Sequence, residues 1–297
     1  MENRIALTIA PGGENHHKNQ FIGVQPTPGT GFTVQDLQGI YDYLKNKQYV
    51  VELKNLNELS EIKEFQTEPV ESASVLIVRN YLNGSNTAKM YNELNQDKWD
   101  KHYLDPNKYR TVIEKKTIDG KEVDIPVKKK GRVMNKRARQ NICYANFDQE
   151  PSYLEGKGRI VKISKKPTLN GTLVQLTKHL TDALNSIEST TKVMINVVEG
   201  NRYIDPGKTK TKATQQGIGW HGDTERVMVI CLTIGGLGNY PLHFNWFKKN
   251  YPYGKRIDIG LNDGDLYIMS ETNTPQDGFS IYRRTQQRPN RSNKSRK

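Results

Sequence analysis

The feature that most narrows the fold is a series of short apolar segments in the last third of the chain. From Lys192 onward, segments rich in β-branched and aromatic residues follow one another with turns between them: KVMINVVEG, RVMVICLTIG, PLHFNWF, RIDIGL and GDLYIMS. Many short strands at close spacing are typical of a β-sandwich or barrel. This part of the chain therefore predicts a fold of the jelly-roll type.

Helical patterns come before these strands. Apolar residues recur at three- and four-residue steps in LNGTLVQLTKHLTDALNSI, a helix that Asn170 is suited to cap. A helix capped by Thr33 is predicted over FTVQDLQGIYDYLKNKQ, and a strand followed by a helix over SVLIVRNYLNGSNTAKMYNELNQDKW. A hairpin with its turn at Asp119-Gly120 is predicted in the charged segment 105–131. Helices that precede strands indicate the α+β class.

Three parts are expected along the chain. Residues 1–70 contain turn-rich stretches such as PGGENHHKNQ and QPTPGTG, and they are predicted to form an N-terminal extension. Residues 71–282 form the core domain. Residues 283–297 carry seven basic residues, no acid and no large apolar side chain, so they are predicted to be a disordered basic tail.

The apolar content bears on where the protein is located. No apolar run approaches the roughly 18 residues that a membrane helix needs, and the first residues lack the basic region and cleavage site of a secretory signal. Cys143 and Cys231 lie in apolar contexts and are expected to be buried thiols. An intracellular monomer, cytoplasmic or nuclear, is expected.

The charge points to a polyanionic partner. Lys and Arg number 45 and Asp and Glu 32, a net charge of +13, which favours DNA or RNA. A membrane surface is disfavoured, because no basic helix with an aromatic apolar face is seen. Basic runs followed by aromatic residues suit a nucleic-acid groove, and a solvated charged loop is the alternative. The candidate nucleic-acid contacts are Lys128, Lys129, Lys130, Arg132, Lys136, Arg137, Arg139 and Tyr144.

The stretch GIGWHGDTERVMVICLTIGG combines polar residues with an apolar strand. His221 and Asp223 are two residues apart, so in a strand their side chains share one face. One histidine and one carboxylate on a rim, with a further ligand from a later strand, are what an iron(II) oxygenase needs. Taken alone, His-x-Asp is also a common surface pair.

Several segments together resemble the AlkB family of iron(II)- and 2-oxoglutarate-dependent dioxygenases, which oxidise alkyl groups on nucleobases. NRYIDPG, GIGWHGDTER, VICLTIG and LNDGDLYIMSETNT resemble its catalytic half. SVLIVRNYLNGSNTAKMYNEL resembles its opening strand and helix, and GRVMNKRARQNICYANF the segment that lines its nucleotide-recognition lid. The similarity covers about residues 74–280, and the motif is closest in form to the DNA-repair members. The resemblance implies a double-stranded β-helix, or jelly roll, with supporting helices, and it implies Fe(II), 2-oxoglutarate and O₂.

The resemblance also implies roles for individual residues. His221 and Asp223 would be the first two iron ligands, and Glu225 the acid that faces the target base. Asn201 and Tyr203 match the Asn-x-Tyr pair whose side chains hold 2-oxoglutarate. Without the resemblance, the same two residues would be interpreted as a turn residue and a core aromatic.

The chain departs from the family pattern in three places. The segment TKTKATQQ lengthens the connection between Tyr203 and His221, which a loop at the rim tolerates. The family's third iron ligand is a histidine after the GDLYIMS strand, whereas no histidine follows His243 here. If one gap is allowed, the expected position falls at Asp277 or Gly278; Asp277 is a chemically possible ligand, and the alternatives are His243 or no third protein ligand. The family's last strand carries two arginines spaced Arg-x5-Arg that pair with 2-oxoglutarate; Arg283 and Arg284 are candidates by position alone.

These observations predict an AlkB-like dioxygenase that removes alkyl groups from nucleobases by oxidation. One alternative is a nucleic-acid-binding protein that keeps the fold but has an altered metal site and impaired catalysis. Another is an oxygenase that hydroxylates a different substrate, such as a protein side chain. The third ligand and the arginine pair distinguish the first two functions.

Overall fold

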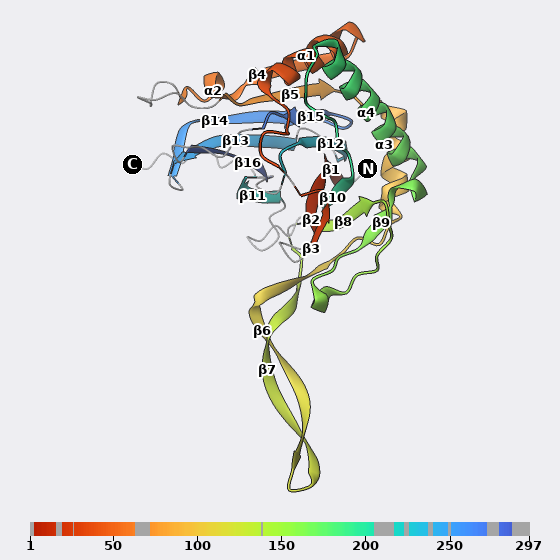
Figure 1. Cartoon of the computed structure of the whole chain (residues 1–297), viewed down its shortest axis with the longest axis vertical. Helices are drawn as coiled ribbons and strands as arrows, with labels where there is room; N and C mark the ends of the chain where they lie inside the picture. Colours follow the sequence, from red (N-terminus) through yellow and green to blue (C-terminus); the bar gives the residue numbers. More distant parts are fainter. Residues whose placement is uncertain are drawn as a thin grey trace, which may run out of the picture.

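The computed structural model describes residues 3–15, 20–25, 27–62, 72–137, 139–204, 217–222, 226–236, 240–248, 251–271 and 279–286. Within them the chain forms a layer of helices, two β-sheets and a long β-hairpin that projects from the body (Figure 1). The predicted α+β class is therefore confirmed.

The larger sheet has eight strands, and every neighbouring pair is antiparallel except β8 and β9. In order across the sheet, its strands are β4 (Val50–Asn55), β5 (Ser74–Arg79), β15 (Leu266–Met269), β12 (Val229–Gly235), β1 (Arg4–Ala10), β10 (Val197–Tyr203), β8 (Gln140–Ala145) and β9 (Ile160–Lys162).

Helices pack on one face of this sheet (Figure 1). They are α1 (Val34–Asn46), α3 (Gly84–Asn95) and α4 (Pro167–Ser186), with the short α2 (Leu56–Leu59), η2 (Tyr153–Glu155) and η3 (Ile163–Lys165) elsewhere. The predicted leucine stripe of α4 is buried against the sheet, at Leu169, Leu173, Leu176, Leu180 and Leu184.

The helix caps follow the sequence in one case and differ in the other. Thr33 accepts a hydrogen bond from the Asp36 amide, and Asp36 accepts one from Thr33, so the predicted cap of α1 is confirmed as a capping box. Asn170 does not cap α4, because the helix already begins at Pro167. The Glu93 carboxylate instead accepts the amides of Thr168 and Leu169, at 2.8 and 3.0 Å.

The smaller sheet covers part of the opposite face. Its order is β11 (Gly217–His221), β16 (Phe279–Gln286), β13 (Tyr240–Lys248) and β14 (Tyr251–Leu261). Side chains from β5, β12 and β15 form a second core with side chains of β13 and β14: Val75, Ile77, Cys231, Tyr267, Leu242, Phe244, Trp246, Ile257, Ile259 and Leu261. We call the face of the large sheet that points toward the small sheet its inner face.

The described residues among the first 62 are part of the same packed unit. Strand β1 lies between β12 and β10, β4 pairs with β5, and α1 joins the helix-side core. This corrects the expectation of a separate N-terminal extension. The turn-rich stretch after β1 forms the hairpin β2 (Gly12–Asn15) and β3 (Gln20–Gly23), which packs through Ile22 on the inner face beside Cys143 and Val197.

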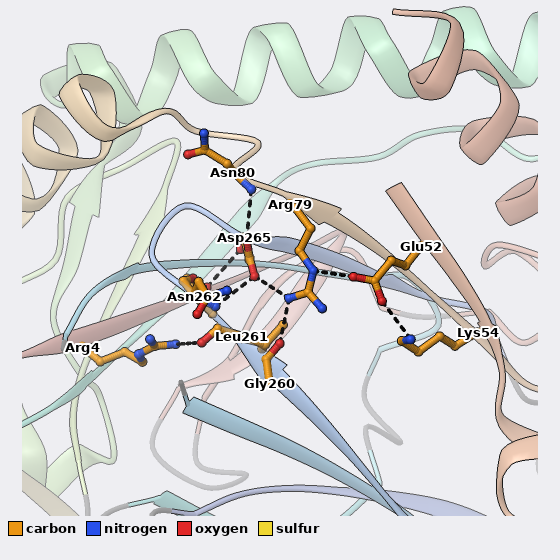
Figure 2. Close-up of polar contacts among 10 residues, drawn as sticks. Arg4, Glu52, Lys54, Arg79, Asn80, Gly260, Leu261, Asn262 and Asp265 are labelled. Atoms are coloured by element: carbon orange, nitrogen blue, oxygen red, sulfur yellow. Dashed lines mark hydrogen bonds and ion pairs between the residues drawn. The ribbon is translucent and has the colours of Figure 1, made fainter. Parts of the chain in front are cut away.

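A buried carboxylate holds the turn between β14 and β15. Asp265, in the GDLYIMS segment, is 1% exposed and accepts hydrogen bonds from Arg79 Nη1 at 2.7 Å and from the Asn80 and Asn262 amides at 2.9 Å (Figure 2). Arg79 also donates to Glu52 and to the Gly260 carbonyl. Because these groups satisfy one another, the cluster is structural.

The long hairpin consists of β6 (His102–Ile118) and β7 (Lys121–Asn135). Its turn is Asp119-Gly120, as predicted, with φ of 52° and 75° at the two residues. Such left-handed values favour Gly, Asn and Asp in a two-residue hairpin turn. The hairpin meets the body at its base, where the rings of His102 and Tyr153 lie 5.5 Å apart.

Both cysteines are buried thiols, as expected, and burial raises the pKa of the Cys143 thiol well above its ordinary value. In the part of the chain that the structure describes, no helix is both long enough and apolar enough to cross a membrane.

Candidate functional site

The inner face of the large sheet is apolar over β5 and β15. Polar side chains gather on it over β1, the C-terminal part of β10 and the start of β8. Alternation along β10 turns Val198 toward the helices, and Glu199, Asn201 and Tyr203 toward the inner face. The same alternation in β1 and β8 adds further polar side chains to this face. We call this set the polar face: Arg4, Thr8, Asn141, Glu199, Asn201 and Tyr203.

Strand β1 forms the edge of the polar face next to β12, and β10 runs through its middle. Arg4 lies opposite Tyr203, and Ala6 lies opposite Asn201. Arg4 is 4% exposed, and its Nη1 donates to the Leu261 carbonyl of β14 at 3.2 Å, so its side chain extends from one sheet toward the other (Figure 2). Ala6 is the residue of β1 that keeps partial exposure, so solvent reaches the inner face beside Asn201.

Asn201 is the centre of a hydrogen-bonded cluster. Its Oδ1 accepts from Arg139 Nε and from Asn141 Nδ2, both at 2.5 Å. Lys136 Nζ donates to Asn141 Oδ1 at 2.9 Å. On the other side, Asn201 Nδ2 lies 3.4 Å from Glu199 Oε1, and Glu199 is paired with Arg226. The structure thus brings together a predicted 2-oxoglutarate residue and two predicted nucleic-acid contacts.

Lys136, a cation within this cluster, has a lowered pKa. Burial is the main reason that the pKa of its ammonium group falls from 10.5 to about 8. The positive charge of Arg139 contributes to this lowering, and the negative charges of Asp100 and Glu199 oppose it without cancelling it. A strongly shifted pKa is common at functional sites, so this cluster is a candidate ligand-binding site.

His221 is held in a form suited to bind a metal ion. It ends β11, where it pairs with Arg283 of β16, and its Nδ1 lies 2.7 Å from the Gly219 carbonyl oxygen. Because a carbonyl only accepts, Nδ1 carries the proton, and in the neutral ring Nε2 has the lone pair that a metal requires. Trp220 precedes it and packs edge-on against Phe247, with ring centres 5.5 Å apart.

The other predicted iron ligands, Asp223 and Asp277, and the predicted base-facing Glu225 lie outside the described residues. Among the residues that are described, no three His, Cys, Asp or Glu side chains gather closely enough to hold a metal ion. Arg283 and Arg284 belong to β16, which corrects the expectation that the disordered tail begins at residue 283, but their side chains are outside the description. The complete iron site therefore stays a prediction.

His243, the alternative third ligand, is engaged elsewhere. Its neighbours Leu242 and Phe244 face the core between the sheets, so alternation turns His243 to the outer side of β13. There its Nδ1 lies 2.5 Å from Asp258 Oδ1, and Arg256 donates twice to the same carboxylate. This arrangement contradicts a role for His243 as an iron ligand.

Comparison with known proteins places the chain in a family. An uncharacterized protein of Acanthamoeba polyphaga mimivirus is 31% identical over 273 residues, which are 91% of this chain and 88% of the viral protein. This chain belongs to the family of that viral protein. No protein-family model matches the chain. The viral relative matches nearly the whole length of the fold described above, so the resemblance between the two is not confined to one motif.

The predicted nucleic-acid contacts that carry charge lie in three places in this protein: on the hairpin strand β7, near the hairpin base and in the Asn201 cluster. Lys128, Lys129, Lys130 and Arg132 are exposed on β7 of the hairpin, where Lys129 also pairs with Glu114 at 2.6 Å. Arg137 is exposed near the hairpin base. Lys136 and Arg139 lie in the Asn201 cluster instead.

Tyr144 is not available to stack on a base, which corrects the prediction. Alternation in β8 places Ile142 and Tyr144 on the helix side and Cys143 on the inner face. Tyr144 is 0% exposed, and its hydroxyl donates to Asp97 Oδ2 at 3.0 Å. Burial, followed by the negative charge of Asp97, raises the pKa of this phenol well above its ordinary value.

Sequence reasoning missed Arg4, Asn141 and Glu199. One usable signal existed for Asn141: it follows Arg139 by two residues, as Cys143 follows Asn141, so the three share a face if the segment is a strand. Arg4 gave no such signal, because its neighbours in the sheet, Tyr203 and Gly235, are far away in the sequence.

Proposed function

We propose that the protein is an AlkB-like, iron(II)- and 2-oxoglutarate-dependent dioxygenase that removes alkyl groups from nucleobases by oxidation. The polar face supports this best: Asn201 and Tyr203, which the resemblance assigns to 2-oxoglutarate, are buried side by side on β10, next to Arg4. A dicarboxylate requires cations and N–H or O–H donors, and charge-assisted hydrogen bonds are the stronger kind. Arg4, Arg139 and Lys136 bring that charge within or beside this face.

We also propose that the two sheets form a jelly roll that the N-terminal strand completes. From β10 to β16 the chain alternates between the large and small sheets: β10, β12 and β15 belong to the large one, and β11, β13, β14 and β16 to the small one. An eight-stranded jelly roll needs one more strand. Strand β1 fills the position between β10 and β12, so that Arg4 lies opposite Tyr203.

In this proposal each site residue has a separate role. His221, through Nε2, and Asp223 would hold the iron, which supplies the capacity to activate O₂ when it is bound. Asn201, Tyr203 and Arg4 would bind and orient the oxo acid beside it. Glu225 would contact the target base.

The hairpin supports a nucleic-acid substrate. Its half nearest the body carries more cations than anions: Lys108, Arg110, Lys128, Lys129, Lys130 and Arg132 against Asp105, although Glu114 of the outer half reaches Lys129. A projecting two-stranded ribbon with this charge can follow a phosphate backbone and neutralise it. Arg110 is held by the Lys130 and Gly131 carbonyls at 3.0 and 2.5 Å, which ties the two strands together where this charge is concentrated.

A second candidate function is a nucleic-acid-binding protein with impaired catalysis. The observation that favours it is the third ligand position: no histidine follows His243, and His243 itself is paired with Asp258. An aspartate ligand at position 277 would give a site with one histidine and two carboxylates, which suits Fe(II) less well.

One assay distinguishes the two. The protein is purified without oxygen, supplied with Fe(II) and 2-oxoglutarate, exposed to O₂, and succinate release is measured with and without alkylated single-stranded DNA or RNA. The dioxygenase function predicts release that nucleic acid stimulates and that His221→Ala abolishes. Nucleic-acid binding without succinate release would support the second function.

A further inference from the structure

We propose that Arg139 and Lys136 are positioning residues that fix the side-chain amide of Asn201, so that its NH₂ group points to an acid ligand on the polar face. The identity of the ligand as a 2-oxo acid rests on the proposed function. The orientation of the amide does not, because it follows from the hydrogen-bonding capacity of the neighbouring residues.

The first step concerns Arg139. An asparagine amide has a donor end and an acceptor end of nearly the same shape, and its orientation is set by its partners. A guanidinium donates hydrogen bonds and has no acceptor. The Asn201 atom that lies 2.5 Å from Arg139 Nε must therefore be the carbonyl oxygen.

The second step concerns Lys136, which is also a donor toward its partner. Lys136 Nζ lies 2.9 Å from Asn141, so the carbonyl oxygen of Asn141 must face the lysine. The NH₂ group of Asn141 is then turned toward Asn201, where it donates to Oδ1 at 2.5 Å. Lys136 thus acts on Asn201 through Asn141, and Arg139 acts on it directly.

As a result, the oxygen of the Asn201 amide is fully used by two donors, whereas its NH₂ group can donate to a ligand. Two donors already use the two lone pairs of Asn201 Oδ1. The described contact of Nδ2, to Glu199 Oε1 at 3.4 Å, is long for a hydrogen bond, and Glu199 is already neutralised by Arg226. A ligand carboxylate can replace that contact, whereas a flipped amide would direct its oxygen at the ligand and repel it.

The position of Asn201 makes the orientation useful. Asn201 is 4% exposed, yet the neighbouring residue across the ladder, Ala6, keeps partial exposure. A small group that binds beside Ala6 would therefore lie next to Asn201.

The experiment compares Arg139→Met with Arg139→Lys, which keeps a cation that only donates toward Asn201. Lys136→Met and Lys136→Arg form the second pair. Asparagine-selective ¹⁵N labelling gives side-chain NH₂ signals, and the Asn201 signal is identified by its loss in Asn201→Ser. We expect the Asn201 signal to move and broaden in both methionine variants and to stay close to wild type in Arg139→Lys and Lys136→Arg.

Calorimetry with 2-oxoglutarate and Mn(II) measures the consequence. Affinity for 2-oxoglutarate should fall about tenfold in Arg139→Met, as expected when a ligand loses an oriented donor, and change by less than about threefold in Arg139→Lys. Thermal unfolding of each variant shows whether it is folded. An Asn201 signal that is the same in all variants would overturn the positioning role. A signal that responds as expected in a wild-type protein that does not bind 2-oxoglutarate would instead overturn the proposed function and its ligand.

Discussion

Arg4 and Tyr203 face each other across the β1–β10 ladder, and both side chains are buried on the inner face of the large sheet. The two residues lie far apart in the sequence, and their strands, β1 and β10, are neighbours in the sheet. The N-terminal strand thus supplies a buried cation, Arg4, beside Tyr203, the phenol that the resemblance assigns to 2-oxoglutarate binding. This pair links the topology of the fold to the proposed chemistry.

The first prediction concerns Arg4. Arg4→Met keeps much of the volume but removes the charge, so affinity for 2-oxoglutarate should fall by about tenfold or more, as for the loss of a charge-assisted hydrogen bond. Calorimetry measures the affinity. Arg202→Met is the matched control, because Arg202 lies on the helix side of β10, with its guanidinium 4.9 Å from the Trp99 ring centre. Equal losses in both variants would argue against a specific role for Arg4.

The second prediction tests whether the N-terminal strand is integral to the fold. Leu7 is 0% exposed in the centre of the large sheet, so Leu7→Ala should lower the free energy of unfolding by about 2–5 kcal/mol. Val24→Ala, at a residue that is 47% exposed, should change it by less than about 0.5 kcal/mol. Urea denaturation gives both values. Small changes in both would mean that residues 1–25 are an appendage after all.

Local patterns in the sequence predicted local structure well. The capping residues of α1, the leucine stripe of α4 and the Asp119-Gly120 turn all depend on contacts within a few residues. The pairing of one strand with another does not depend on such local contacts. The alternation of Ile5, Leu7 and Ile9 is compatible with a strand, but the strand partners of Leu7 are Gly200 and Leu232, which lie 193 and 225 residues further along the chain.

The candidate site was predictable only in part for the same reason. Asn201 and Tyr203 were identified by resemblance, but the contact of Arg139 with Asn201 spans 62 residues and depends on the pairing of β8 with β10. Tyr144 was assigned to the wrong face because the sequence does not reveal which side of β8 the helices cover. Alternation determines which residues share a face, and only the tertiary fold determines what that face meets.

The third prediction concerns pH and Lys136. The folded protein holds the pKa of this lysine at about 8, below its ordinary value of 10.5, mainly through burial. Between those pH values the unfolded chain binds more protons, so the contribution of Lys136 to stability rises with pH across this interval. Arg139 adds to the shift, while Asp100, Glu199 and Cys143 oppose it.

Lys136→Met should therefore stabilise the protein at pH 7, by an amount on the order of 1–2 kcal/mol, and lose that advantage as the pH rises toward 10.5. Urea denaturation of the variant and wild type at pH 7 and pH 10 measures the difference. Lys115→Met is the control, since Lys115 is exposed on the hairpin. An advantage of Lys136→Met that does not depend on pH would show that packing, and not the charge, is responsible.

The last prediction concerns the hairpin. Lys128 and Lys130 share one face of β7 near the body, and both are exposed. Replacing both with serine should weaken binding to single-stranded DNA. The slope of log K against log salt should become shallower by about 0.7 for each phosphate that the variant no longer neutralises, or by about 0.9 on a duplex. Fluorescence anisotropy over a series of salt concentrations measures the slope.

The matched control replaces Lys115 and Lys121 near the tip, where Lys115 is already paired with Glu122 at 3.1 Å. If nucleic acid lies along the half of the hairpin nearest the body, the control slope should match wild type, whereas equal changes in both variants would indicate a general effect of net charge.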